Sequence, residues 1–204
     1  MFDYVADLHW DNGMAGGPHG WFASINIANF QAGGRVLLVA GDTGERFEDV
    51  ADFLNMAANC YERVIAIPGN HEDGVLGALR DNVHVLRNAS LALDTGTTIY
   101  GGELFKVYPE DVAAIQAIPG RRIILSHHVP TPRVGKALGY DLTGKTNGLI
   151  ELLGPAARDT VIVFGHAHLE FDGTIDGYRC LSMPRGYRGV RRDGTPFKKF
   201  GNFV

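Results

Sequence analysis

Cysteines are scarce in this sequence, and long apolar runs are missing from it. Cys60 and Cys180 are the only two cysteines among 204 residues, and neither has the spacing of a thiolate metal site. A disulfide framework is therefore excluded, which is typical of a reducing compartment. No stretch approaches the roughly 18 apolar residues that span a bilayer. No charged and apolar leader precedes the first strand-like run. We therefore expect a cytoplasmic protein with no membrane partner.

The sequence also lacks an excess of one charge. It carries 19 basic and 23 acidic residues, and its formal net charge of −4 argues against a nucleic-acid surface over the whole protein. One basic stretch remains after residue 184, where six arginines and lysines accompany a single aspartate. The length suits one domain with one large core, which we place at residues 1–204.

Short apolar runs indicate the secondary structure. Five of them are typical of strands buried on both faces, and each leads into a polar cluster: residues 2–6, 35–40, 63–68, 122–126 and 160–164. Helical patterns lie between them at residues 47–61, 109–118 and 147–153. This alternation predicts an α/β sheet. Further short strands predict a second, mixed sheet packed on the first: residues 83–86, 91–94, 97–100, 170–175 and 178–183.

The polar clusters contain the residue types that bind metals. In chain order they read Asp7-Leu8-His9, Gly41-Asp42-Thr43-Gly44-Glu45, Gly69-Asn70-His71-Glu72, Ser126-His127-His128 and Gly165-His166-Ala167-His168. On an extended chain the D-x-H and H-x-H pairs would each point to one side, so that both members could hold one ion. We expect all five clusters to converge on one rim of a sheet.

The number of candidate ligands predicts two ions rather than one. The seven candidates are Asp7, His9, Asp42, Asn70, His127, His166 and His168. One ion rarely takes so many ligands when several are imidazoles, whereas two ions bridged by Asp42 use all seven and leave room for water. Oxygen and nitrogen donors without thiolate suit Mn, Fe, Zn, Ni or Co.

The ordered set D-x-H, G-D-x-x-E, G-N-H-E, H-H and G-H-x-H resembles the calcineurin-like metallophosphoesterase superfamily, in a small, uncapped form of bacterial or phage type. The resemblance covers residues 7–168. It implies a four-layer α-β-β-α sandwich of two mixed β-sheets flanked by helices. It also assigns the ligands: Asp7, His9, Asp42 and His168 for the first ion, and Asp42, Asn70, His127 and His166 for the second. Manganese is the first choice of metal.

The resemblance also implies a mechanism. A metal-bound hydroxide would attack the phosphate, His71 would assist the leaving group, and Glu45 would orient His71. His127 and His128 cannot point the same way on an extended chain. The resemblance favours His127 as the ligand, which leaves His128 to line the substrate pocket. Arg185 and Tyr187 are candidates for supporting the site or contacting phosphate.

We therefore predict a phosphoesterase that acts on small phosphate esters, phosphodiesters in particular. One alternative is a nuclease of the same superfamily, which would use DNA or RNA as substrate. The other is a non-catalytic, protein-binding scaffold, which the intact His71 and ligand set disfavour. Two glycine-rich segments, residues 11–20 and 135–148, are candidates either for the substrate-facing rim or for mobile surface loops. The oligomeric state stays open.

Overall fold

The computed structural model describes residues 1–10, 27–72, 78–156, 159–186, 194 and 199–204. Its strands form two mixed sheets. The first has the order β11-β1-β2-β3-β4, with β1 at Phe2–Val5, β2 at Val36–Ala40, β3 at Arg63–Ile67, β4 at Val83–Val85 and β11 at Gly201–Phe203. Within it β1 to β4 are parallel and β11 is antiparallel to β1.

The second sheet has the order β5-β6-β7-β8-β10-β9. Its strands are β5 at Ala89–Ala92, β6 at Thr97–Gly102, β7 at Arg121–Ser126, β8 at Thr160–Phe164, β9 at Phe171–Ile175 and β10 at Tyr178–Ser182. The two outer strands, β5 and β9, are antiparallel to their neighbours, while the inner four are parallel. The helices are η1 at Ile27–Asn29, α2 at Phe47–Ala57, α3 at Pro109–Ala117, α4 at Pro132–Leu138 and α5 at Leu149–Leu153.

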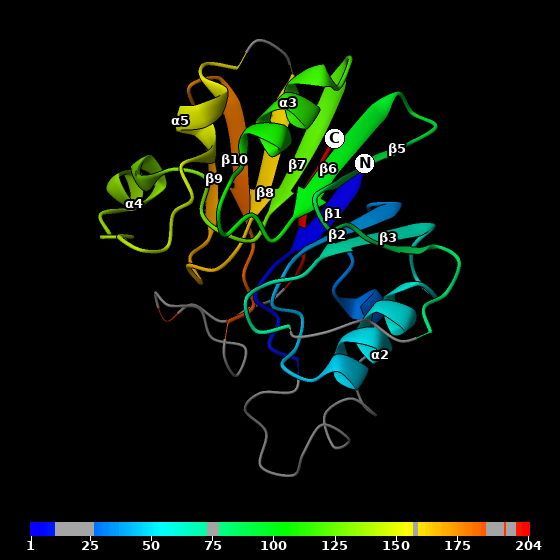
Figure 1. Cartoon of the computed structure of the whole chain (residues 1–204). Helices are drawn as coiled ribbons and strands as arrows, with labels where there is room; N and C mark the ends of the chain where they lie inside the picture. The colour runs from blue at the N-terminus through cyan, green and yellow to red at the C-terminus, as the bar shows by residue number, and fades with distance from the viewer. Residues whose placement is uncertain (11–26, 73–77, 157–158, 187–193, 195–198) are drawn as a thin grey trace.

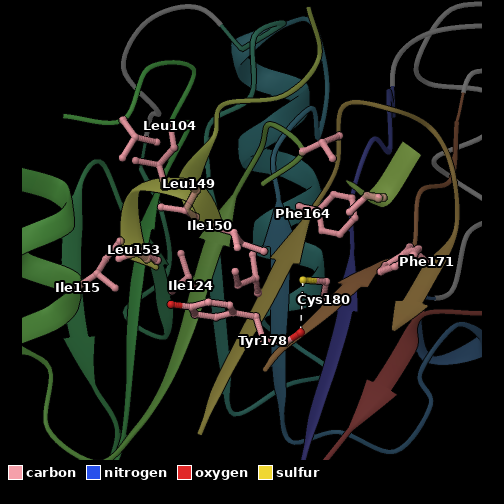
Figure 2. Close-up of a cluster of buried hydrophobic side chains, with 14 of the residues drawn as sticks. Leu104, Ile115, Ile124, Leu149, Ile150, Leu153, Phe164, Phe171, Tyr178 and Cys180 are labelled. Carbon is pink, nitrogen blue, oxygen red and sulfur yellow. Dashed lines mark hydrogen bonds between the residues drawn. The ribbon is translucent and has the colours of Figure 1, made fainter. Parts of the chain in front are cut away.

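Alternation along the central strands builds four layers. In β2, Leu38 faces the second sheet, whereas Leu37 faces the core beneath α2. In β8, Val163 faces the first sheet, whereas Ile162 faces the core beneath α3 and α5. Three apolar interfaces therefore separate four layers, which are α2, the first sheet, the second sheet and the helices α3 to α5 (Figure 1). Figure 2 shows the interface between the second sheet and the helices that cover it, with Phe164 and Tyr178 reaching into it. The four-layer α-β-β-α prediction is confirmed.

The predicted assignment of strands to sheets is wrong in part. β7 and β8, expected beside the first three strands, lie in the second sheet, and β4, expected in the second sheet, lies in the first. A strand buried on both faces has the same apolar pattern in either sheet, so its sequence does not specify its neighbours. The short strand β11 was not predicted. Part of the glycine-rich segment at residues 135–148 forms the end of α4.

A buried carboxylate in the first sheet connects β1 with three remote segments of the chain. Asp3, in β1, is fully buried and accepts hydrogen bonds from Ala32 N at 2.8 Å, Gly34 N at 2.7 Å, the Tyr61 hydroxyl at 2.7 Å and Asn202 Nδ2 at 2.7 Å. Each donor offsets part of the cost of burying the charge. This network explains why an aspartate can stand within an apolar strand.

None of the helices in the described part of the chain has the length and apolar character needed to cross a bilayer.

Candidate metal centre

The candidate ligands lie where strands of both sheets end. Asp7 and His9 follow β1, Asp42 follows β2, Asn70 follows β3, His127 follows β7, and His166 and His168 follow β8. The sheets pack face to face, so the carboxyl ends of these strands meet at a common rim. The sequence placed the site on the rim of one sheet, whereas the structure forms it from the rims of two.

Left-handed turns bring the side chains together. Positive φ angles occur at Asp7 (47°), His9 (41°), Asp42 (51°), His166 (67°) and His168 (55°). Such angles are uncommon outside glycine and persist where the surrounding structure enforces them, often at functional sites. The prediction that the D-x-H and H-x-H pairs point to one side on extended chain is therefore wrong. β1 and β8 end before these pairs begin, and the turns produce the convergence instead.

One group of donor atoms comprises Asp7, His9, Asp42 and His168, whose ligand atoms all lie within 4.8 Å of one another. The Nε2 atoms of His9 and His168 are 3.1 Å apart. The Asp42 Oδ2 atom lies 3.8 Å from His9 Nε2, and the Asp7 Oδ1 atom lies 3.8 Å from His168 Nε2. Ligand atoms held about 2.1 Å from one ion are separated by roughly these distances. These four side chains match the set that the sequence assigned to the first ion.

A second group comprises Asp42, His127 and His166, with Asp42 shared between the two groups. His127 Nε2 lies 3.2 Å from Asp42 Oδ2 and 3.0 Å from Asn70 Oδ1, and His166 Nδ1 lies 2.8 Å from Asn70 Oδ1. The Ala40 carbonyl lies 3.0 Å from His127 Nδ1 and can only accept, so this ring nitrogen carries the proton. The other ring nitrogen is thereby directed at Asp42 and Asn70, as for a histidine that ligates a metal.

Burial sets the protonation of these side chains. It lowers the pKa of His9 and of His166 to about 3 and that of His168 to about 4, so all three imidazoles are neutral at pH 7. Burial also raises the pKa of Asp7 to about 7. For His127, burial lowers the pKa, but the hydrogen bond and charge of Asp42 outweigh it and raise the pKa to about 9. Three of the four candidate imidazole ligands are therefore neutral donors, whereas His127 is protonated beside Asp42 and would give up its Nε2 proton to bind a metal.

The donor set fits divalent metal ions. Asp7 is fully buried, and its Oδ1 atom accepts a hydrogen bond from His166 N at 2.7 Å. Its Oδ2 atom has no hydrogen-bond partner among the described residues. A buried carboxylate oxygen without a donor is costly unless it meets a cation. Imidazole, carboxylate and amide ligands without a thiolate are typical of sites for Mn, Fe, Zn, Co or Ni.

His71 and Glu45 stand beside the first group, on the side open to solvent. His71 Nδ1 lies 3.4 Å from Glu45 Oε1, and the two side chains are 34% and 41% exposed. The His71 ring lies 5.1 Å from the His9 ring, and its backbone N–H donates to Asp42 Oδ1 at 3.0 Å. An imidazole held near a carboxylate at the edge of the cluster can give or take a proton there.

Sequence reasoning missed the structural part played by Glu72. This half-buried carboxylate accepts hydrogen bonds from Thr43 N and Gly69 N, each at 2.5 Å, and so joins the segments that carry Asp42 and Asn70. Burial raises its pKa, while the two N–H donors act in the opposite direction. A side chain on Gly69 would collide with Asp42, so only glycine allows this close approach. In the sequence, the only feature that could have indicated this role was the position of Glu72 at the end of the G-N-H-E cluster.

The remaining candidates lie around the cluster. His128 is buried, and its ring lies 4.2 Å from that of His166. Arg185 is buried too and donates from Nη1 to the Leu8 carbonyl at 2.7 Å, which braces the D-x-H segment. Tyr187 and the glycine-rich segment at residues 11–20 lie outside the described residues. Lys145, which no sequence signal had marked, lies with Nζ 3.4 Å from the His166 carbonyl.

Comparison with known proteins identifies the family. The sequence profile of the calcineurin-like phosphoesterases matches residues 2–183, so the chain belongs to this family. A search of the curated proteins found no significant match.

Two solved structures share the fold. A phosphopantetheinyl hydrolase from Mycobacterium tuberculosis has 16% identity and a TM-score of 0.62, over 98% of this chain and 95% of that one. A putative 5'-nucleotidase from Staphylococcus aureus, in complex with alpha-ketoglutarate, has 15% identity and a TM-score of 0.56, over 91% of this chain and 48% of that one. At such low identity these structures support the fold and not a substrate.

Proposed function

We propose that this protein is a phosphoesterase that works with two divalent metal ions, manganese being the first choice. The observation that carries the proposal is the pair of donor groups that share Asp42. Asp7, His9, Asp42 and His168 would hold the first ion, and Asp42, Asn70, His127 and His166 would hold the second. When bound, two such ions supply the charge that orients a phosphate and activates the attacking water.

The side chains around the ions would complete the reaction. His71 would donate a proton to the departing alkoxide, and Glu45 at 3.4 Å would keep its ring in place. Asp42 holds the backbone N–H of His71 through the same carboxylate that joins the two donor groups, so ligand and acid move as one unit. His128 would line the substrate side. Arg185 would keep the D-x-H segment in position rather than contact the phosphate, in line with its buried bond to Leu8.

Phosphodiesters are the substrates we propose, and the exposure of His71 and Glu45 supports them. A site that opens to solvent leaves room for the second ester group of a diester. We keep residues 1–204 as one domain and a cytoplasmic location, with which the two free thiols are consistent. Action on DNA or RNA is the alternative within the same chemistry. It would appear as salt-dependent association with nucleic acid.

The test is hydrolysis of bis-p-nitrophenyl phosphate and p-nitrophenyl phosphate by protein that is stripped of metal and refilled with Mn²⁺. We expect faster cleavage of the diester, with two metal ions per chain by elemental analysis. His71→Ala should keep both ions and lose about 10²- to 10⁴-fold in turnover. His84→Ala is the matched control, because this half-buried histidine lies in β4, outside the cluster.

Each result separates one part of the proposal from the rest. A preference for the monoester would replace the phosphodiesterase by a phosphatase. Full activity in His71→Ala would remove the acid role of His71 but keep the metal centre. Two bound ions without turnover of either ester would favour the non-catalytic scaffold, and failure to bind any ion would refute the metal centre itself.

A further inference from the structure

A large aromatic side chain is exposed beside the metal centre. Phe105 lies in the turn between β6 and α3, and it is 67% exposed. Its ring lies 5.0 Å from that of His128 in an edge-to-face arrangement. The His128 ring lies in turn 4.2 Å from that of His166, a candidate ligand. The exposed Phe105 therefore contacts His128, which in turn contacts a member of the second group of donors.

Single exposed apolar residues are ordinary on protein surfaces, so exposure alone assigns no function. The difference here is that the turn is held firmly. Leu104 has a φ of 51°, a conformation that leucine rarely adopts, and its side chain is buried in the outer core (Figure 2). The Glu103 carbonyl accepts from His127 N at 3.1 Å, and the Leu104 carbonyl accepts from Asn147 Nδ2 at 2.8 Å.

These contacts anchor the backbone that leads into Phe105, while the Phe105 side chain itself stays exposed. The hydrogen bond to the Glu103 carbonyl comes from the backbone N–H of His127, a candidate metal ligand, so the turn is joined directly to the second donor group. The contact with His128 leaves Phe105 67% exposed to solvent. An exposed ring on an anchored segment can stack on a flat group while little of the backbone has to be ordered on binding.

We propose that Phe105 is the stacking platform for a planar aromatic or heteroaromatic group of the substrate, such as a nucleobase. The inference rests on the proposed phosphoesterase function, because the phosphate would occupy the metal centre while the ring stacks on Phe105. The substrate class is then a phosphate ester whose organic part carries a base or another flat ring.

The test compares two ligands that differ only in the base. Binding of adenosine 5'-monophosphate and of ribose 5-phosphate would be measured by calorimetry on the full chain loaded with Mn²⁺, with His71→Ala as background so that neither ligand is consumed. We expect the nucleotide to bind more tightly. Phe105→Ala should weaken nucleotide binding by about 5- to 100-fold, the usual range for loss of one base–aromatic stack, and leave ribose 5-phosphate unchanged.

Two further variants control for trivial effects. Phe105→Tyr keeps the ring and should keep the preference for the nucleotide. Leu152→Ala removes another exposed apolar side chain, 53% exposed in α5, and should change neither affinity.

Equal affinities for the two ligands, or equal losses in Phe105→Ala, would overturn the stacking role while the phosphate site stands. Tight binding of octyl phosphate that depends on Phe105 would assign the platform to an aliphatic chain instead. If neither sugar phosphate nor nucleotide binds, the phosphate site and the stacking role both fall.

Discussion

Replacing Glu72 by glutamine tests whether the metal centre depends on a carboxylate that touches no ion. The two Glu72 oxygens each accept one backbone N–H, from Thr43 and from Gly69, at 2.5 Å. Glutamine has the same shape but only one acceptor oxygen, so its amide N–H₂ would face one of these two donors. The substitution therefore removes one hydrogen bond to a charged group and leaves a buried donor without a partner.

The expected magnitude follows from that single bond. A hydrogen bond to a charged group contributes about 1.5–3 kcal/mol, so the free energy of unfolding should fall by about 2 kcal/mol. For a domain of this length each kcal/mol shifts Tm by about 2–4 °C, which predicts a loss of about 4–8 °C in the metal-free protein. Because the bond joins the segments of Asp42 and Asn70, metal affinity should also fall by about 10- to 100-fold.

Differential scanning calorimetry of the metal-free protein and competition titrations with Mn²⁺ would measure the two effects. Asp52→Asn is the control, since it makes the same carboxylate-to-amide change at an exposed position of α2. A Glu72→Gln variant with the Tm and Mn²⁺ affinity of the unmodified protein would refute the reasoning. A lower Tm with unchanged affinity would limit Glu72 to the stability of the fold.

Three further predictions concern the rest of the molecule. Asp3→Ala removes the acceptor of four hydrogen bonds, so urea unfolding should show a loss of at least about 3 kcal/mol, while metal content at low temperature stays at two ions per chain. Chelation of the metals should lower Tm by about 5–10 °C for each ion removed, relative to protein with free Mn²⁺ at 100 times its Kd, and an unchanged Tm would contradict specific binding to the folded state. Burial raises the pKa of Cys180 to about 12, so its thiolate is scarce at pH 8 and should increase as pH rises. Mass spectrometry after alkylation should therefore find half-buried Cys60 modified first, and equal rates would contradict this.

The chemistry of the site could be predicted because each candidate ligand lies in a short stretch of sequence that identifies it. Each candidate ligand belongs to a short polar cluster directly after an apolar run, and such runs form strands wherever they pack. The residue types alone indicate imidazole, carboxylate and amide donors without thiolate, which narrows the metals before any distance is known. Two packed sheets followed from the two sets of short strands, whereas the four-layer order was implied by the resemblance to the calcineurin-like metallophosphoesterases.

Contacts between segments remote in sequence were decided only by tertiary packing. β7 and β8 are apolar on both faces, so their membership of the second sheet depends on which surfaces they meet. Glu72 lies 29 residues from Thr43, and Asp3 lies 199 residues from Asn202, and local pattern does not encode such pairings. The left-handed turns at the ligands and the position of Phe105 beside His128 likewise appear only in the folded chain. Local sequence specifies backbone preference and chemistry, whereas the distance between remote groups depends on how the whole core packs.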